Sequence, residues 1–510
     1  MASQPLRIFF SAGEPSGDLH AANLIRQLRA RLSGTSPPIP AQEHWQSQWH
    51  PASIPDPQSP ILLPTQWHPR ELEAVGYGGP QMAAAGCRLH ADLTQLAVMW
   101  LARAIVNLPK FWDLASRADR YFRHHRPDAV VLVDYPGFNW WIARRAKVHG
   151  IPVFYYTPPQ IWAWATWRVK KMRRLADHVL CSLPFEEAWF RQHGCNATFV
   201  GHPFFDEVRQ QRLDAEFLAR EGRRPGPLVT ILPGSRTQEV SHNFRWLLKA
   251  AAAVHGAVPG ARFAVAAFKP KHAEMARRWA AGTGQWDVRC GEEDSSRHRA
   301  PCLHGRCAVR PALAGLADGT PLASPDAFHT SGHTPCAMAD GTRSVPATIL
   351  APPRPTLDIY TGRTPELMRL ANCCMACSGS VSLELLYHAK PTVILYWVNR
   401  PAYALQGYFR KVKYITLVNL LSSGELYPAD RSPYDPSQRG AQQVLFPEYL
   451  TCEDRSEQIA GHVIEWLTDP AKRAARVAEL ERLKAQVAHG GASSRAAEYI
   501  IRHLPQESDP

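Results

Sequence analysis

The chain has 510 residues, more than a single hydrophobic core usually serves, so we expect at least two domains. A hydrophobic share of 45% and a charged share of 20% exclude a wholly disordered or fibrous protein. The formal net charge of +13 indicates an anionic partner, such as a nucleotide sugar, an acidic membrane surface or nucleic acid. Because the basic residues are spread out and form no nucleic-acid-binding motif, nucleic acid ranks last of these three partners and is not expected.

The N-terminal part of the chain alternates short apolar runs with amphipathic segments. An apolar strand is predicted at 6–10, a loop with Gly and Ser at 11–18, and then a helix to about residue 32. Residues 35–72 are rich in Pro and Gln and are interpreted as a flexible insertion. The alternation continues with further predicted strands and helices at 129–134, 140–149, 151–157, 167–175, 178–183, 185–193 and 197–200. This order predicts a doubly wound parallel sheet of the α/β class.

A second α/β series follows a charged stretch at 204–226, so the predicted domains are 1–205 and 206–510. Residues 288–355 shift to Pro, His, Ala and Cys without periodicity and are interpreted as a disordered insertion. The chain ends in a helical tail at about 455–503. The predicted strands and helices of the second series are 228–232, 243–255, 261–268, 373–377 and 391–397.

Eleven cysteines and the first ten residues bear on the cellular compartment. An odd cysteine count, and a start that lacks the apolar core and cleavage site of a secretory signal, favour the reducing cytoplasm. No stretch reaches the roughly 18 continuous apolar residues that span a bilayer, so membrane contact is expected to be peripheral. A zinc site at Cys373, Cys374 and Cys377 is disfavoured because these residues lie in a predicted buried strand, and no metal is expected.

Ligands of open parallel sheets bind beyond the carboxyl ends of the strands, which makes the loops there the candidate site. Asp134 closes an apolar strand and is either a catalytic base or the first residue of a solvated turn. Glu14 and Asp18 are rival carboxylates on the first loop.

Two loops of the second series are candidates for binding a diphosphate. Gly234, Ser235 and Arg236 follow its first strand, and an Arg guanidinium matches phosphate oxygens, although a plain surface turn is equally compatible. Ser378, Gly379 and Ser380 connect a strand to a helix. Their backbone N–H groups would face an anion there, with Glu384 near a ribose, unless the segment is simply a capped helix with a solvated Glu.

The apolar segment 93–112 carries two basic residues and is either a membrane-docking helix or a core helix. Its candidate membrane residues are Met99, Trp100, Leu101, Ile105 and Leu108. Trp162 and Trp164 are interpreted either as lining for an acceptor or as core residues.

Several of these segments together resemble the lipid A disaccharide synthase family. They lie in the family's order between residue 6 and about residue 425, and as a set they are highly specific. The matching segments are SAGEPSGDLHAANLIRQL (11–28), GYGGPQMAAAGC (76–87), LTQLAVM (93–99), VDYPGFN (133–139), PPQIWAW (158–164), LPFEEAWF (183–190), FVGHP (199–203), LPGSRTQEV (232–240), SGSVSLE (378–384) and VNLL (418–421).

The resemblance implies a GT-B glycosyltransferase, with two Rossmann-like domains and a cleft between them. It implies that UDP-2,3-diacylglucosamine and 2,3-diacylglucosamine 1-phosphate are joined by an inverting β-1,6 transfer that releases UDP, without a metal or other cofactor. By position, the catalytic carboxylate matches Asp134, the phosphate-contacting residue matches Arg236, and the UDP loop matches Ser378 to Glu384 with Asn419 nearby. The family works at the inner leaflet of the cytoplasmic membrane, docked through the segment that matches 93–112, and a homodimer is compatible with it.

The chain departs from the family's pattern at Gly137, where the family commonly has a second Asp, so Asp134 must serve alone. The two insertions match nothing in the family pattern, and residues after about 425 match it weakly. Two alternatives stay open at this point. One is another GT-B enzyme that acts on UDP-N-acetylglucosamine, and the other is a non-catalytic relative that binds lipid or nucleotide.

Overall fold

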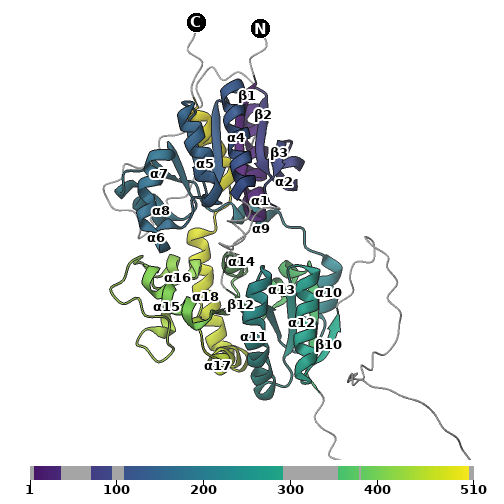
Figure 1. Ribbon diagram of the computed structural model, residues 1–510. Coiled ribbons are helices and arrows are strands. Elements are labelled where there is room, and N and C mark those ends of the chain that lie inside the picture. Colours follow the sequence, from purple (N-terminus) through teal and green to yellow (C-terminus); the bar gives the residue numbers. More distant parts are fainter. Residues whose placement is uncertain are drawn as a thin grey trace, which may run out of the picture. The chain divides into compact units, whose positions relative to one another are not determined.

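The computed structural model describes residues 5–35, 70–94, 108–290, 354–377, 379 and 381–504. Most of both predicted insertions lies outside these residues. The described chain contains two seven-stranded sheets, each flanked by helices (Figure 1). Every strand pair in both sheets is parallel. The α/β class with two doubly wound sheets, which the sequence predicted, is confirmed.

The first sheet has the strand order β3-β2-β1-β4-β5-β6-β7, so the direction of winding reverses between β1 and β4. Its middle strand, β4, is entirely apolar and buried because helices cover both of its faces. The strands are β1 (Leu6–Ala12), β2 (Leu72–Gly78), β3 (Arg88–Asp92), β4 (Ala129–Val133), β5 (Val153–Tyr156), β6 (His178–Cys181) and β7 (Ala197–Phe199). The helices are α1 (Pro15–Leu32), α2 (Pro80–Ala84), α4 (Leu108–His125), α5 (Pro136–Val148), α6 (Ile161–Trp164), the 3-10 turn η1 (Thr166–Arg168), α7 (Val169–Leu175) and α8 (Pro184–Gln192).

The second sheet repeats the same topology, with the order β10-β11-β9-β8-β12-β13-β14 and a reversal between β8 and β12. Its strands are β8 (Leu228–Leu232), β9 (Arg262–Ala267), β10 (Asp287–Cys290), β11 (Thr356–Thr361), β12 (Cys373–Cys377), β13 (Thr392–Trp397) and β14 (Glu448–Thr451). Its helices are α9 (Phe204–Gln210), α10 (Ala215–Gly222), α11 (Thr237–Ala257), α12 (Pro270–Thr283), α13 (Thr364–Leu370), α14 (Val381–Tyr387), α15 (Arg400–Phe409), α16 (Leu417–Ser422) and the 3-10 turn η2 (Ala441–Gln443).

The predicted helical tail consists of α17 (Ser456–Thr468), α18 (Pro470–Val487) and α19 (Ala492–Arg502). Helix α17 packs against α11 of the second series (Figure 1). Helix α19 packs against α1. Ala496, Ala497 and Ile500 share a core with the buried side of α1 and with β1. The division at residue 205/206 stays a prediction.

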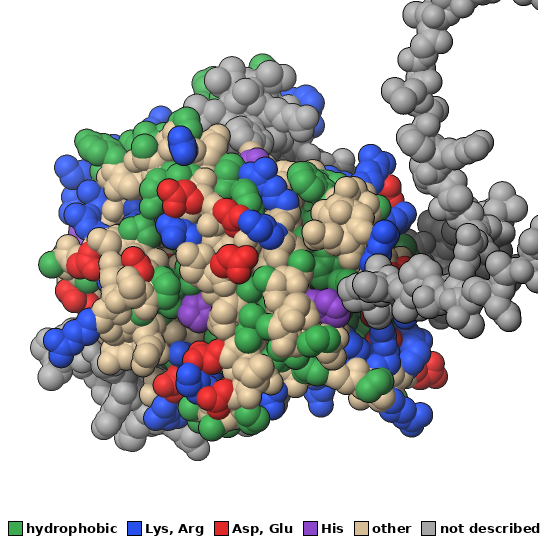
Figure 2. All heavy atoms as spheres, turned by 90° about the horizontal axis from the view of Figure 1, so that it is seen from below, with side chains coloured by type: hydrophobic (Ala, Val, Ile, Leu, Met, Phe, Trp, Pro, Cys, Tyr) green, Lys and Arg blue, Asp and Glu red, His purple; other side chains and the backbone are tan. Residues whose placement is uncertain are grey.

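No helix within the described ranges is long and apolar enough to cross a bilayer. The face of the molecule shown in Figure 2 mixes basic, acidic and apolar side chains, without a large area of one kind. On that face the net positive charge is therefore not concentrated as it is in a nucleic-acid-binding surface.

Candidate functional site

Asp134 lies in a tight turn between β4 and α5, at the carboxyl edge of the first sheet and beside its winding reversal. Both Asp134 and Tyr135 have a left-handed backbone, with φ of +44° and +42°. Such a conformation is costly for non-glycine residues and persists only where the surroundings hold it.

The buried Asn139 side chain holds this turn. Its Nδ2 donates to the carbonyl oxygens of Asp134 at 2.8 Å and Val133 at 3.2 Å, and its Oδ1 accepts from Ser11 Oγ at 2.7 Å. The Tyr155 hydroxyl also donates to the Asp134 carbonyl, at 2.7 Å. The Asp134 backbone is thus fixed from both β1 and β5. None of these hydrogen bonds uses its carboxylate.

The surroundings of the Asp134 carboxylate raise its pKa to about 6. Partial burial is the main cause, because it disfavours the charged form, and the negative charge of Glu14 adds to it. A backbone hydrogen bond and the nearby His20 and Arg236 act in the opposite direction. A carboxylate with this pKa is largely ionised at neutral pH and is still a competent proton acceptor.

Glu14 precedes the first turn of α1 and lies beside the Asp134 turn. The neighbouring Gly13 makes this approach possible, because a Cβ there would lie 2.1 Å from the ring of Tyr135. The Glu14 carboxylate is 3.7 Å from the Arg236 guanidinium, which belongs to the loop before α11. Asp134, Glu14 and Arg236, all predicted as site residues, are therefore brought together.

The loop of Gly234, Ser235 and Arg236 is held by Glu239 in the first turn of α11. Its Oε2 accepts from the backbone N–H groups of Ser235 at 3.0 Å and Arg236 at 3.2 Å, and its Oε1 lies 3.1 Å from the Arg236 guanidinium. Gly234 has φ of +127°, and a Cβ there would lie 2.5 Å from the Glu239 side chain. This glycine lets the loop close over Glu239 and present Arg236 outward.

Two predicted site residues have side chains engaged inside the protein. The Asp18 carboxylate is buried and accepts from the backbone N–H groups of Gly79, Gln81 and Met82 at 2.8 to 3.1 Å, at the start of α2. The buried Asn419 amide bonds both backbone polar groups of Phe446 and the carboxylate of Glu448. These contacts favour a structural role for both residues.

The predicted UDP loop is only partly visible, since Ser378 and Ser380 lie outside the described residues. Gly379 is exposed, and Glu384 is buried in α14 with its Oε1 lacking a hydrogen-bond partner. Burial raises the pKa of Glu384 to about 7, helped by the charges of Glu207 and Glu366, while a hydrogen bond from Gln211 opposes this. An unpartnered buried oxygen on this element is compatible with a ligand hydroxyl.

Sequence reasoning missed a histidine and glutamate pair beside these groups. His20 Nδ1 lies 2.6 Å from Glu207 Oε1, and both side chains are largely buried. His20 lowers the pKa of Asp134, and Glu207 raises that of Glu384, so each member of the pair acts on one of the two carboxyls. His20 belongs to the SAGEPSGDLH segment, but nothing in its spacing indicates a partner 187 residues away.

The residues predicted to contact the membrane or the acceptor differ in how they are placed in the structure. Met99, Trp100, Leu101 and Ile105 lie outside the described residues. Leu108 begins α4 and is 55% exposed, and Trp112 on the next turn is 56% exposed. Trp162 is fully buried against Phe185 and donates to Glu186, so it is a core residue, whereas Trp164 is 36% exposed.

Cys373, Cys374 and Cys377 lie in the buried strand β12, as the sequence predicted. Nowhere in the described part of the chain do three His, Cys, Asp or Glu side chains gather in a way that could hold a metal ion.

The chain is similar to characterised families over nearly its whole length. A family model described as lipid-A-disaccharide synthetase matches residues 61–295 and 347–437, which is more than half of the chain. The lipid-A-disaccharide synthase of Myxococcus xanthus is 27% identical over 504 residues, covering 99% of both chains. That of Geobacter metallireducens is 25% identical over 499 residues, covering 98% of this chain and 97% of the relative.

Among solved structures, a putative UDP-N-acetylglucosamine 2-epimerase from Listeria monocytogenes superposes with a TM-score of 0.53 at 8% identity. The match covers 99% of this chain and 98% of that one, and at this identity it concerns the fold alone. The two-domain GT-B architecture is thereby supported over the whole length. On the family match, the chain belongs to the lipid-A-disaccharide synthetase family of glycosyltransferases.

Proposed function

We propose that this enzyme joins UDP-2,3-diacylglucosamine to 2,3-diacylglucosamine 1-phosphate. In this reaction the acceptor's 6-hydroxyl attacks the anomeric carbon of the donor sugar, on the face opposite the diphosphate. A β-1,6 bond forms, the bond between the anomeric carbon and the phosphate oxygen breaks, and its electron pair leaves with UDP. The relatives are named lipid-A-disaccharide synthases, which supports this pair of substrates.

Asp134 is the proposed general base, and the raised pKa of its carboxyl is the observation that carries the proposal. The carboxylate takes the proton of the 6-hydroxyl as the new bond forms, which increases the nucleophilicity of the oxygen. Its backbone is fixed by Asn139 and Tyr155, so the carboxylate is held in place before substrate binds. Burial and then the charge of Glu14 keep the pKa high, while a backbone hydrogen bond, His20 and Arg236 act against the rise.

Arg236 is the proposed contact for the diphosphate. Its guanidinium is partly exposed, it is steadied by Glu239, and it lies next to the group that we propose as base. An Arg fork pairs with phosphate oxygens and stabilises the negative charge that develops on the leaving UDP. Ser378 to Glu384, with Gly234 and Ser235, are proposed to complete the UDP site.

We place the enzyme at the inner leaflet of the cytoplasmic membrane, where acylated substrates reside. The exposed Leu108 and Trp112 at the start of α4 continue the apolar segment that begins at Leu93. Trp112 contacts Trp141 of α5 edge-on at 5.3 Å, which extends the exposed aromatic surface. Exposed Trp and Leu side chains suit the region between lipid headgroups and acyl chains.

The test is to incubate the purified protein with both proposed substrates and to follow UDP and acylated disaccharide 1-phosphate by mass spectrometry. The wild type is expected to form both products in equal amounts. Asp134→Asn is expected to lower kcat by about 100- to 10,000-fold, as expected for loss of a general base. Asp287→Asn, an exposed aspartate at the edge strand β10, is the control and should retain full turnover.

Release of UDP without an acylated disaccharide would contradict the proposed acceptor. Full turnover of Asp134→Asn would remove Asp134 as the base.

A further inference from the structure

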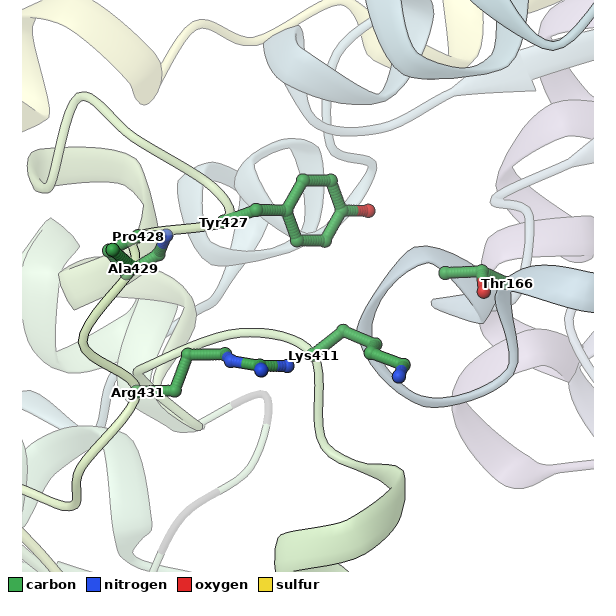
Figure 3. A pocket seen from close by; sticks show the side chains of 6 residues that line it. All are labelled: Thr166, Lys411, Tyr427, Pro428, Ala429 and Arg431. Atoms are coloured by element: carbon green, nitrogen blue, oxygen red, sulfur yellow. The ribbon is translucent and has the colours of Figure 1, made fainter.

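A cavity of about 380 Å³, whose lining includes none of the proposed site residues, is lined by two basic side chains and the Thr166 hydroxyl. Lys411 and Arg431 come from two loops of the second series, and Thr166 comes from η1 after β5 (Figure 3). The Lys411 side chain extends toward Thr166, and that of Arg431 reaches toward Lys411. Tyr427, Pro428 and Ala429 complete the lining.

The frame of this cavity is built from buried hydrogen bonds. Arg410 is buried, and its guanidinium donates to the carbonyl oxygens of Lys413 and Arg431, each at 2.7 Å, which ties the two loops together. The Lys411 N–H donates to the Ala163 carbonyl at 2.9 Å, and the Tyr427 hydroxyl donates to the Trp162 carbonyl at 3.0 Å. The cavity walls are therefore fixed relative to one another, and Lys411 and Arg431 line a prearranged space.

The charges that line the cavity are not neutralised by carboxylates. No Asp or Glu belongs to the lining, and the nearby Asp430 is engaged by Lys413 at 3.0 Å. Within the described ranges neither Lys411 nor Arg431 forms an ion pair with a side chain. Two cations beside a hydroxyl donor match the three acceptor oxygens of a phosphate group.

Exposed apolar side chains flank the cavity on the same two segments. Trp167, next to Thr166, is 57% exposed, and its ring lies 6.3 Å from that of Phe409, two residues before Lys411. Leu405 and Tyr408 of α15 are also exposed, and α15 buries none of its residues. Apolar surface beside a cationic pocket suits a molecule that carries both a phosphate and acyl chains.

We propose that this cavity binds the phosphate of a phosphorylated lipid, with the acyl portion lying along Trp167, Phe409 and α15. Thr166, Lys411 and Arg431 donate to the phosphate oxygens. Two lipids carry this chemistry at the membrane surface: a bilayer phospholipid and, if the proposed function holds, the acceptor sugar through its 1-phosphate.

The test replaces both cations by neutral residues in the full-length protein, as Lys411→Gln with Arg431→Gln. Neither side chain supports the frame described above, so the variant is expected to fold, which thermal unfolding checks. Lys413→Gln is the matched control, because it removes a cation from the same loop that Asp430 already neutralises. Binding of the acceptor 1-phosphate is followed by isothermal titration calorimetry, and binding of phosphatidylglycerol vesicles by flotation, with phosphatidylcholine vesicles for comparison.

We expect the double variant to weaken one of these two interactions by about 10- to 100-fold, the usual effect of losing charged hydrogen bonds. Weaker acceptor binding, with no such loss for an acceptor that lacks the phosphate, identifies the acceptor as the ligand. Weaker vesicle flotation with unchanged acceptor binding identifies a phospholipid headgroup. If both interactions match those of the control, the proposal is overturned.

Because these are equilibrium measurements, they do not depend on turnover. A wild type that forms no disaccharide would contradict the proposed function while the binding data still decide the role of the cavity.

Discussion

Asp134 has a backbone conformation that few residues adopt, at a point where its side chain must meet another molecule. Aspartate and asparagine tolerate the left-handed region better than most residues, because their short polar side chains can bond locally. The same residue has a raised pKa, which means that the folded protein holds the ionised carboxyl less favourably than the unfolded chain does. The proposed base therefore reduces stability at the pH where it works.

The raised pKa of Asp134 predicts how the free energy of unfolding depends on pH. A raised pKa contributes stability below the unfolded value near 3.8, and this contribution is lost as pH rises through about 6. Asp134→Asn removes the titrating group and keeps the shape. It is therefore expected to be more stable than the wild type by about 1–3 kcal/mol at pH 7.5, and equally stable near pH 3.5. Urea unfolding at both pH values measures the difference, and a variant that is less stable at pH 7.5 would contradict the pKa shift.

Gly137 offers a second test of the same carboxyl. It is exposed in the first turn of α5, and a Cβ there would meet no atom within 4 Å, so a side chain can be added without strain. Gly137→Asp introduces a second carboxylate three residues after Asp134. Its negative charge near Asp134 is expected to raise the pKa of that carboxyl further. The acidic limb of the pH profile of kcat/KM should then move from about pH 6 upward by roughly half a pH unit.

Gly137→Asn controls for the added side chain and should leave the limb in place. A limb that shifts equally in both variants would show that charge is not the cause.

Among the secondary-structure elements, the β4–α5 turn depends on one buried amide. Asn139 lies on the first turns of α5 but bonds to Ser11 of β1 and to the end of β4, so it joins three elements. Asn139→Ala is expected to lower the free energy of unfolding by about 2–4 kcal/mol, because it leaves several buried groups without partners. Activity should fall with it, since the Asp134 turn loses its support. Ser11→Ala removes only one of these bonds and should cost about 1 kcal/mol.

Denaturant unfolding and turnover of the two variants are compared directly. Equal stability losses in both would mean that the Asn139 network is not what holds the turn.

The elements that could be predicted from the sequence are those whose signal is local. β4 is an uninterrupted apolar run and β8 is apolar except for the buried Thr230, because helices cover both of their faces, and α11 shows its helical period. Strands β2, β3, β10, β11 and β14 were not predicted. Of these, β3 is an edge strand with no buried residue and the edge strand β10 is largely exposed, whereas β2, β11 and β14 are mostly buried. The sequences of β3 and β10 lack a buried face, so only their neighbours in the sheet make them strands.

In the candidate site, too, some features could be predicted from the sequence and others could not. The positions of Asp134, Glu14 and Arg236 could be predicted, because loops at the carboxyl ends of parallel strands meet. The engagement of Asp18 with α2 and of Asn419 with Phe446 could not, since it depends on which backbone groups lie opposite in three dimensions. The pair of His20 and Glu207 was missed for the same reason.

At the scale of the whole molecule, the last described helix, α19, packs against the first helix, α1. α19 follows the second series in sequence, yet it shares a core with β1 and α1. Arg31 of α1 bonds Ser494 and pairs with Glu498, and the Asp206 carboxylate accepts from the backbone of Ser493 at 2.9 Å. The helix that carries Glu14 at its start is therefore supported by residues almost five hundred positions away.

A chain that ends at Val487 is expected to lose stability in the first series above all, because it exposes the apolar face of α1 that α19 covers. Burial of Ala496, Ala497 and Ile500 against that face contributes several kcal/mol by area, a large fraction of the usual stability of a domain. Unfolding should then begin at a lower temperature, with earlier hydrogen exchange in β1 and α1 than in β8 and α11. A chain that ends at Leu504 keeps all of α19 and is the control. Equal exchange rates in α1 for the two chains would show that α19 does not support the first sheet.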